Sequence, residues 1–248
     1  MVCGYGSYVN YISNEAQVIA ALNYHNLLIS GARTTNDITL SNTDTIGIAG
    51  NFVNTAVFTT GGFVTTGSTI NFNGTGNQDI TAQASDDFYQ NLVLSKGGIK
   101  TLKTASTING NLFIAENVTL IDGGYLLSGT GLASGTFTIE NNAVFTMTNN
   151  NTTSGTGNNA SSFPLFKNYD FAATSTVSYA GNTAQDIFAV PADGYGNLEI
   201  TNNTKTADGS FAVQGDLTVG ASTTLYYGTN TITVKGNISN SNVINGSA

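Results

Sequence analysis

Apolar residues occur along this chain in short runs that alternate with polar ones, and Gly, Asn and Asp separate the runs. Alternation with a period of two is typical of half-buried β-strands, and those three residue types favour the turns between them. The segment 15–22 also fits a helix, but its counterparts elsewhere contain Gly, Pro or β-branched residues, and we predict a strand. Representative predicted strands are 17–22, 26–30, 69–72, 91–95, 111–115, 136–140, 143–148, 197–201 and 216–219.

Three segments of the chain share one pattern: an aromatic residue ends a strand, a Gln follows, and Tyr-x-Asn-Leu introduces the next strand. The Gln residues are 61 and then 107 residues apart. Repetition on this scale predicts stacked units, each too small to bury its own apolar face. We expect the shared positions to be structural, and they are Gln17, Gln78, Gln185, Tyr24, Tyr89, Tyr195, Leu27, Leu92 and Leu198.

A shorter period lies inside the long one. An Asn or Asp followed by an apolar residue recurs at spacings of 20, 19 and 21 residues. This predicts a parallel β-solenoid of about 20 residues per coil, with Asn and Gly at the corners, where left-handed backbone angles are needed. A row of tandem β-sandwich repeats is the alternative. The solenoid would be a single domain, 1–248, in three repeats, 9–68, 69–175 (including an inserted polar loop, 146–162) and 176–248.

Composition narrows the classes of function. Apolar residues make up 40% of the chain and charged residues only 9%, and the net charge is −8. The lack of basic stripes argues against nucleic-acid binding, and no apolar run is long enough to span a membrane. Cys3 is the sole cysteine, which rules out an internal disulfide. A polar, weakly acidic surface suits an extracellular setting. Because no secretion signal follows Met1, we expect a piece of a longer protein.

The repeated phrase resembles a repeat of very large secreted surface proteins of Bacteroidota. In the second copy it extends from Phe72 through Gln78-Asp79-Ile80 and Tyr89-Gln90-Asn91-Leu92 to Gly110-Asn111-Leu112, and the third copy matches it from Tyr179 to Gly215-Asp216-Leu217. The first copy departs from it, with Ile12-Ser13 in place of the Asn/Ala-Gly step. The resemblance covers nearly the whole chain and implies a β-helical stalk or adhesin segment, displayed on the cell surface, often through type IX secretion.

Few residues are candidates for a catalytic or binding role. His25 is the only histidine, and Gln90 and Gly196 replace it in the other copies, which indicates a polar edge residue. Asp86-Asp87 is the one adjacent acidic pair and falls in a predicted turn. Val18 stands where the other copies have Asp79 and Asp186, which argues against an essential carboxylate. The repeated Gln predicts a buried amide that satisfies corner backbone groups, or a stacked polar ladder. The repeated Tyr predicts packing, with a sugar-stacking platform as the alternative.

These observations favour a non-catalytic structural or adhesive segment without a cofactor. The nonapeptide of calcium-binding β-rolls is missing, and scattered Ca²⁺ sites are not specified. Expected partners are other segments of the same long protein, other cell-surface or secretion components, and surface glycans. Two alternatives remain: a carbohydrate-active β-helix lyase or hydrolase, and an ice-binding solenoid, to which pairs such as Thr136/Thr138 and Thr146/Thr148 point despite their irregular spacing.

Overall fold

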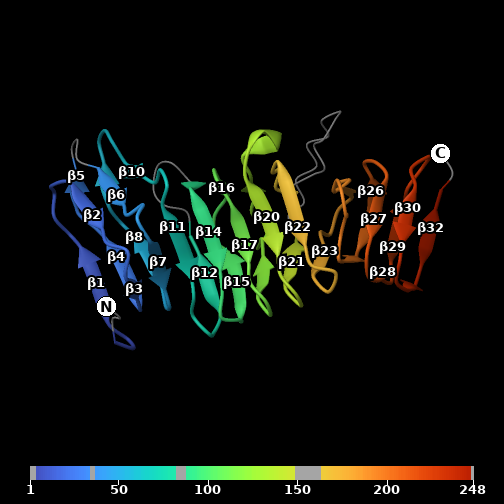
Figure 1. The fold of residues 1–248 in the computed structure, drawn as a ribbon, viewed down its shortest axis with the longest axis horizontal. Helices are drawn as coiled ribbons and strands as arrows, with labels where there is room; N and C mark the ends of the chain where they lie inside the picture. The colour runs from blue at the N-terminus through green and yellow to red at the C-terminus, as the bar shows by residue number, and fades with distance from the viewer. Residues whose placement is uncertain (1–3, 34–36, 82–87, 149–162, 247–248) are drawn as a thin grey trace.

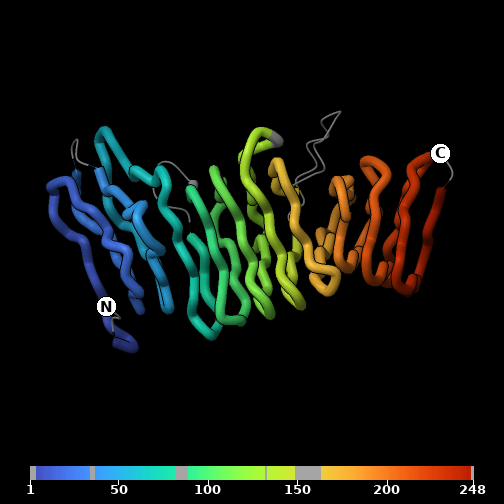
Figure 2. Tube along the Cα trace, in the orientation of Figure 1, coloured from blue at the N-terminus to red at the C-terminus, as the bar shows by residue number. Residues whose placement is uncertain are grey.

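The chain forms a parallel β-solenoid. The computed structural model describes residues 4–33, 37–81, 88–148 and 163–246. Within these ranges the strands, β1 to β32, pair in parallel, and η1 (Gly131–Ala133) is a single turn of 3₁₀ helix. The strands lie side by side along the long axis, from the N-terminal to the C-terminal end (Figure 1). The backbone makes about ten turns of roughly 21 residues (Figure 2). The predicted solenoid is therefore confirmed, and the alternative of tandem sandwiches, which are built from antiparallel sheets, is excluded.

Each coil has three sides. In the middle of the chain, from residue 69 to residue 128, strands of three different sheets follow one another in a fixed order before the first sheet recurs. The first side begins with sheet A and continues as sheet H. Sheet A contains β3 (Asn23–Tyr24), β7 (Thr45–Ile48), β11 (Thr69–Phe72), β14 (Asn91–Leu94), β17 (Leu112–Ile114), β20 (Thr136–Ile139) and β22 (Asn168–Phe171). Sheet H contains β27 (Phe211–Val213) and β30 (Ile232–Val234).

The second side begins with sheet B and continues as sheet E. Sheet B contains β1 (Tyr8–Tyr11), β4 (Asn26–Ile29) and β8 (Phe52–Asn54). Sheet E contains β12 (Gln78–Ile80), β15 (Ile99–Leu102), β18 (Thr119–Ile121), β21 (Val144–Met147), β23 (Thr176–Tyr179), β25 (Asn197–Ile200), β28 (Leu217–Val219) and β31 (Ile238–Asn240).

The third side is divided among four shorter sheets. Sheet C contains β2 (Gln17–Ile19), β6 (Ile38–Leu40) and β10 (Phe63–Val64), and sheet D contains β5 (Ala32–Arg33) and β9 (Val57–Phe58). Sheet F contains β13 (Phe88–Tyr89), β16 (Ser106–Ile108) and β19 (Leu127–Ser128). Sheet G contains β24 (Gln185–Ile187), β26 (Asn203–Ala207), β29 (Thr223–Tyr226) and β32 (Val243–Asn245).

One hydrophobic core runs through the coils. In strand after strand every second residue is buried, as the alternation in the sequence predicts. The parallel register places like residues directly above one another, so that Ile70, Leu92, Leu112 and Phe137 form one inward row in sheet A. The row is continuous, and no coil buries its apolar side chains without its neighbours.

Asn and Gly turn the chain at the corners. Asn117, Asn142 and Asn202 have φ angles of 61°, 56° and 59°. Left-handed angles of this kind are strained for most residues and are tolerated best by Gly and Asn. At these three positions Asn therefore adopts the left-handed backbone angles that the sequence predicts for corners.

The three copies of the repeat do not all occupy the same side of the coil. The strands of the shared motif lie in sheet B in the first copy (β1 and β4), in sheet A in the second (β11 and β14) and in sheet E in the third (β23 and β25). The chain between Gln17 and Gln78 makes two full coils and passes along two further sides. The chain between Gln78 and Gln185 makes four full coils and passes along one further side. The unequal spacing in the sequence thus reflects the different numbers of coils and sides between the copies.

Replacement of a core leucine tests the shared spine. Leu92 is 0% exposed, and its methyl groups lie between those of Ile70 and Leu112 in the neighbouring coils. We expect Leu92→Ala to lower the free energy of unfolding by about 2–5 kcal/mol, since it leaves a cavity in the row. Urea denaturation followed by circular dichroism measures this loss. The outward Thr101→Ala on β15 is the control, with an expected change within about 0.5 kcal/mol; equal losses in both variants would contradict the continuous core.

Candidate functional site

The Gln of the second copy fills a corner between two coils. Gln78 is 5% exposed, and its Nε2 donates to the carbonyl oxygens of Ile48 and Gly50 at 2.9 and 2.8 Å. Its Oε1 accepts a hydrogen bond from the main-chain N–H of Gly74 at 2.8 Å. Backbone groups at a corner have no partner in a sheet, and a buried group without a hydrogen bond is costly. The amide therefore satisfies three backbone groups from two successive coils.

A buried lysine completes this corner. Lys100 lies directly opposite Gln78 in the pairing of β12 with β15, and its side chain points into the solenoid with 0% exposure. Its Nζ donates to Gln78 Oε1 at 2.7 Å and to the carbonyl oxygens of Gly74 and Gly76 at 2.6 and 3.2 Å. Three oxygens thus surround the ammonium group. Because the ligands are backbone and amide dipoles, the charge is solvated without any carboxylate.

The other two copies also have a buried cation at the equivalent corner. Lys205 lies opposite Gln185 and donates to the carbonyl oxygens of Gly181 and Thr183 at 2.9 and 3.1 Å. In the first copy the cation is Arg33, which is 1% exposed and donates through Nη2 to Gln17 Oε1 at 2.7 Å. Gln17 itself is only partly buried. We call the three sites, Gln17 with Arg33, Gln78 with Lys100 and Gln185 with Lys205, the corner clamps.

The cations of the corner clamps are the residues that sequence reasoning missed. A signal was present, since Lys100 and Lys205 follow their Gln by 22 and 20 residues, which is one coil, in a chain with only seven basic residues. Burial lowers the pKa of each lysine to about 8. Burial also lowers the pKa of Arg33. Both lysines are therefore still mainly charged at neutral pH.

The repeated aromatic residues form a T-shaped pair in each copy. Ring centroids are 6.5 Å apart for Tyr11 with Tyr24, 6.4 Å for Phe72 with Tyr89, and 6.5 Å for Tyr179 with Tyr195. The three repeated Tyr are at most 1% exposed, which leaves no ring face for a sugar. Their hydroxyls donate to the carbonyl oxygens of Ala20, Thr81 and Phe188. Burial raises the pKa of Tyr89, Tyr179 and Tyr195.

The repeated leucines pack in the core, and the asparagines before them form hydrogen bonds between successive coils. Leu27, Leu92 and Leu198 are at most 1% exposed and belong to the core. Each is preceded by an Asn whose Oδ1 accepts the main-chain N–H of the next coil; for Asn91 the donor is Asn111 at 3.0 Å. Asn111 Oδ1 in turn accepts from Thr136 N at 2.9 Å. Similar bonds join Asn26 to Asn51, Asn197 to Asp216, and Asp216 to Asn237.

The acidic residues and His25 do not converge on a reaction centre in the described part of the chain. His25 is partly exposed, and its ring lies 4.6 Å from that of Tyr5. Asp79 forms a surface ion pair with Lys103 at 3.4 Å. The pKa of Asp186 is raised, first by burial and then by the nearby charge of Asp208. Asp86-Asp87 lies outside the described residues.

No cluster of three His, Cys, Asp or Glu side chains suited to a metal ion occurs among the residues that the structure describes. In the same ranges no helix has the length and hydrophobicity needed to cross a membrane.

The threonine pairs do not build a regular array. Thr136 and Thr138 face outward on β20, but on the neighbouring strand β17 the residue opposite Thr138 is Phe113. Thr146 on β21 lies between Ile121 and Ser178. The columns of threonine that an ice-binding surface needs are therefore interrupted at both places.

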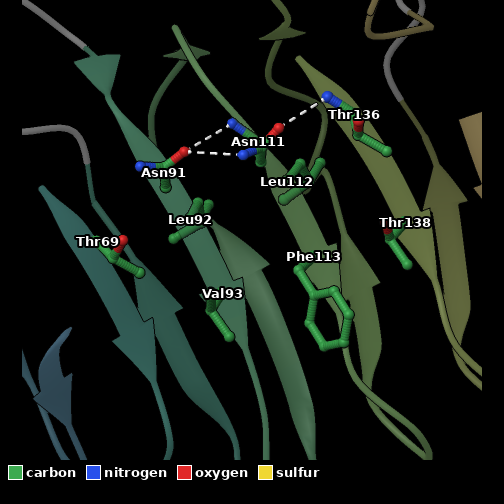
Figure 3. A pocket seen from close by; sticks show the side chains of 9 residues that line it. All are labelled: Thr69, Asn91, Leu92, Val93, Asn111, Leu112, Phe113, Thr136 and Thr138. Atoms are coloured by element: carbon green, nitrogen blue, oxygen red, sulfur yellow. Dashed lines mark hydrogen bonds between the residues drawn. The ribbon is translucent and has the colours of Figure 1, made fainter. Parts of the chain in front are cut away.

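A shallow groove of about 480 Å³ lies on the outer face of sheet A, across β11, β14, β17 and β20. Figure 3 shows its lining side chains and the Asn91–Asn111–Thr136 hydrogen bonds along its edge. The lining contains hydroxyl, amide and apolar groups and no charged side chain. The residues along it are Thr69, Asn91, Leu92, Val93, Asn111, Leu112, Phe113, Thr136 and Thr138, of which Leu92 and Leu112 are the buried core residues described above.

Comparison with known proteins gave no match to a protein-family model, a curated protein or a solved structure.

Removal of the clamp amide tests its structural role. We expect Gln78→Leu to lower the free energy of unfolding by roughly 2–4 kcal/mol, since it deprives buried backbone groups and the Lys100 ammonium of partners. Urea denaturation measures the loss, and Gln90→Leu, whose amide makes one 3.4 Å bond, is the control. A double-mutant cycle with Lys100→Met should show coupling of about 0.5–3 kcal/mol. Additive losses would show that the two side chains act separately.

The clamps also predict a pH dependence of stability. The lysine pKa rises from about 8 in the folded chain toward its ordinary value of 10.5 on unfolding, so the unfolded state binds more protons between these values. The free energy of unfolding should increase from about pH 8 to pH 10. Above about pH 10 it should fall, because the buried Tyr keep their protons while the unfolded chain loses them.

Urea titrations at successive pH values measure this profile. Lys100→Met should reduce the rise between pH 8 and 10, whereas Lys103→Met, at an exposed position, should leave it unchanged. A flat profile in the unmodified protein would contradict the lowered lysine pKa.

Proposed function

We propose that this chain is a non-catalytic structural or adhesive segment of a secreted bacterial cell-surface protein, acting as a repeat stalk or filament. The proposal rests chiefly on one observation. The polar side chains that recur in every copy are used to join one coil to the next, as in the clamp of Gln78 and Lys100 and the ladder from Asn91 to Thr136. Such bonding supports a stiff rod, since each coil is held to its neighbours by side chains as well as by the parallel sheets.

The dimensions and surface suit a spacer. About ten coils at the spacing of paired strands, roughly 4.8 Å, extend over roughly 50 Å. Thr occupies several outward positions, among them Thr101, Thr138 and Thr218, and its hydroxyl group remains hydrated there. The resemblance to Bacteroidota surface repeats supports an extracellular, cell-surface location and export by the type IX route. Partners would then be other segments of the same long protein or other cell-surface and secretion components.

The basic residues weigh against a polysaccharide lyase or hydrolase. Such sites generally place Arg or Lys beside carboxylates in an open cleft. Here Arg33, Lys100 and Lys205 point into the solenoid and donate to backbone or amide oxygens. Asp186, whose pKa is raised first by burial and then by the charge of Asp208, is the carboxylate chosen to test the alternative of an enzyme.

Surface display is tested on intact cells of the source bacterium. Antibody raised against the chain should label unpermeabilised cells, and in-frame deletion of the segment should reduce attachment to surfaces while growth in suspension stays unchanged. Purified protein should show no turnover of pectic or algal polysaccharides. Labelling that requires permeabilised cells would refute the location. Turnover abolished by Asp186→Asn would refute the non-catalytic role.

A further inference from the structure

We propose that the groove on sheet A binds a neutral, linear glycan whose chain runs across the strands. The inference names a ligand class for the adhesive role proposed above and rests on that role. The groove crosses four neighbouring strands of one continuous sheet, β11, β14, β17 and β20 (Figure 3). Four strands at a spacing of roughly 4.8 Å give a floor roughly 14 Å long, which accommodates a short run of sugar rings.

The outward residues of the groove differ between the three copies, which indicates that the scaffold does not require them. The register pairs Val93 with Phe113, and the equivalent outward pairs are Leu28 with Val53 in the first copy and Glu199 with Thr218 in the third. Because the same strands form with Thr or Glu at these positions, the fold does not require apolar side chains there. Of these three pairs only that of the second copy contains an aromatic ring, and this ring lies in the groove.

Phe113 provides the platform for a sugar ring. It alternates with the buried Leu112 and Ile114 along β17, so its ring stands on the outer face of the sheet. Figure 3 shows Phe113 and Val93 on adjacent strands, where they form an apolar strip between polar neighbours. The C–H face of a pyranose packs on such a ring, which contributes area without requiring a charge.

Hydroxyl and amide groups border this strip. The hydroxyls of Thr69 and Thr138 form no hydrogen bond within the described part of the chain, so they can bind sugar hydroxyls. Asn91 and Asn111 are held in position by their bonds to the next coil, at 3.0 and 2.9 Å. A surface that is already rigid loses little entropy when a ligand binds. The groove is thus preorganised by the same ladder that joins the coils.

The charges around the groove select a neutral ligand. The lining has no cation that could pair with a uronate or a sulfate. The exposed Asp170 on β22 lies directly opposite Thr138 in the pairing with β20, at the edge of the groove. A polyanionic glycan would be repelled by this carboxylate and by the net charge of −8. Neutral glucans, mannans and xylans meet no such repulsion.

The binding experiment is an NMR titration of the purified chain with hexasaccharides. Neutral probes are cello-, manno- and xylohexaose, and charged probes are oligogalacturonate and a chondroitin sulfate hexasaccharide. We expect at least one neutral probe to give saturable shifts of the backbone amides of β14, β17 and β20, and the charged probes to give weaker ones.

Variants copied from the third repeat identify the surface while preserving the fold. Phe113→Thr and Val93→Glu introduce the residues found at the equivalent positions Thr218 and Glu199. Phe113→Thr should weaken binding about tenfold, since it removes the aromatic platform. Val53→Thr, which introduces the same residue at the equivalent position of the first copy, is the control and should leave binding unchanged. Circular dichroism checks that every variant remains folded.

Several results would overturn the inference: no saturable shift with any neutral probe, equal affinity after Phe113→Thr, or tighter binding of the charged probes. A separate measurement, the antibody labelling of intact cells, tests the proposed function. Binding that persists while antibody does not label intact cells would refute surface display and leave the groove intact. Labelling without binding would refute the groove alone.

Discussion

The hydrogen bonds between one coil and the next at the corners are the constraint on which the rest of the structure depends. Along the sides, parallel strands satisfy each other's backbone groups. At the corners the chain turns, and the carbonyl oxygens of Gly74 and Gly76 would be left without partners. Lys100 donates to these two oxygens from within the solenoid, and Gln78 donates in the same way to the carbonyl oxygens of Ile48 and Gly50. Because an unsatisfied buried carbonyl is costly, these bonds stabilise the stacking of the coils that carry a clamp.

The clamps also explain why so little charge is available for chemistry. Three of the seven basic residues lie inside the solenoid. A buried cation is usually paired with a carboxylate, but here backbone dipoles and amide oxygens take that place. The outer faces carry Thr, Asn and Ser together with apolar residues such as Val57, Ile238 and Phe113. Comparison of the copies distinguishes the positions that the scaffold requires from those that vary.

Much of this architecture could be predicted from the sequence, because the repeat and the inward alternation are local. The spacing from Asn91 to Asn111 predicts the coil length, and the recurrence of Gln78 predicts a corner role. Lys100 could not be assigned in this way, since a single lysine one coil away carries no local pattern. The groove was equally hidden, because Phe113 becomes outward and adjacent to Val93 only once the register of the strands is known.

The rotation of the second copy onto sheet A has a consequence for how such a chain can diversify. Each copy of the motif has its own clamp and aromatic pair. The strands of the first and third copies lie on the second side of the coil, and those of the second copy lie on the first side. The separation between a duplicated copy and the original therefore need not be a whole number of coils. The length of the segment between two copies determines the side of the solenoid on which the later copy lies. One rod can therefore present different surfaces to different neighbours.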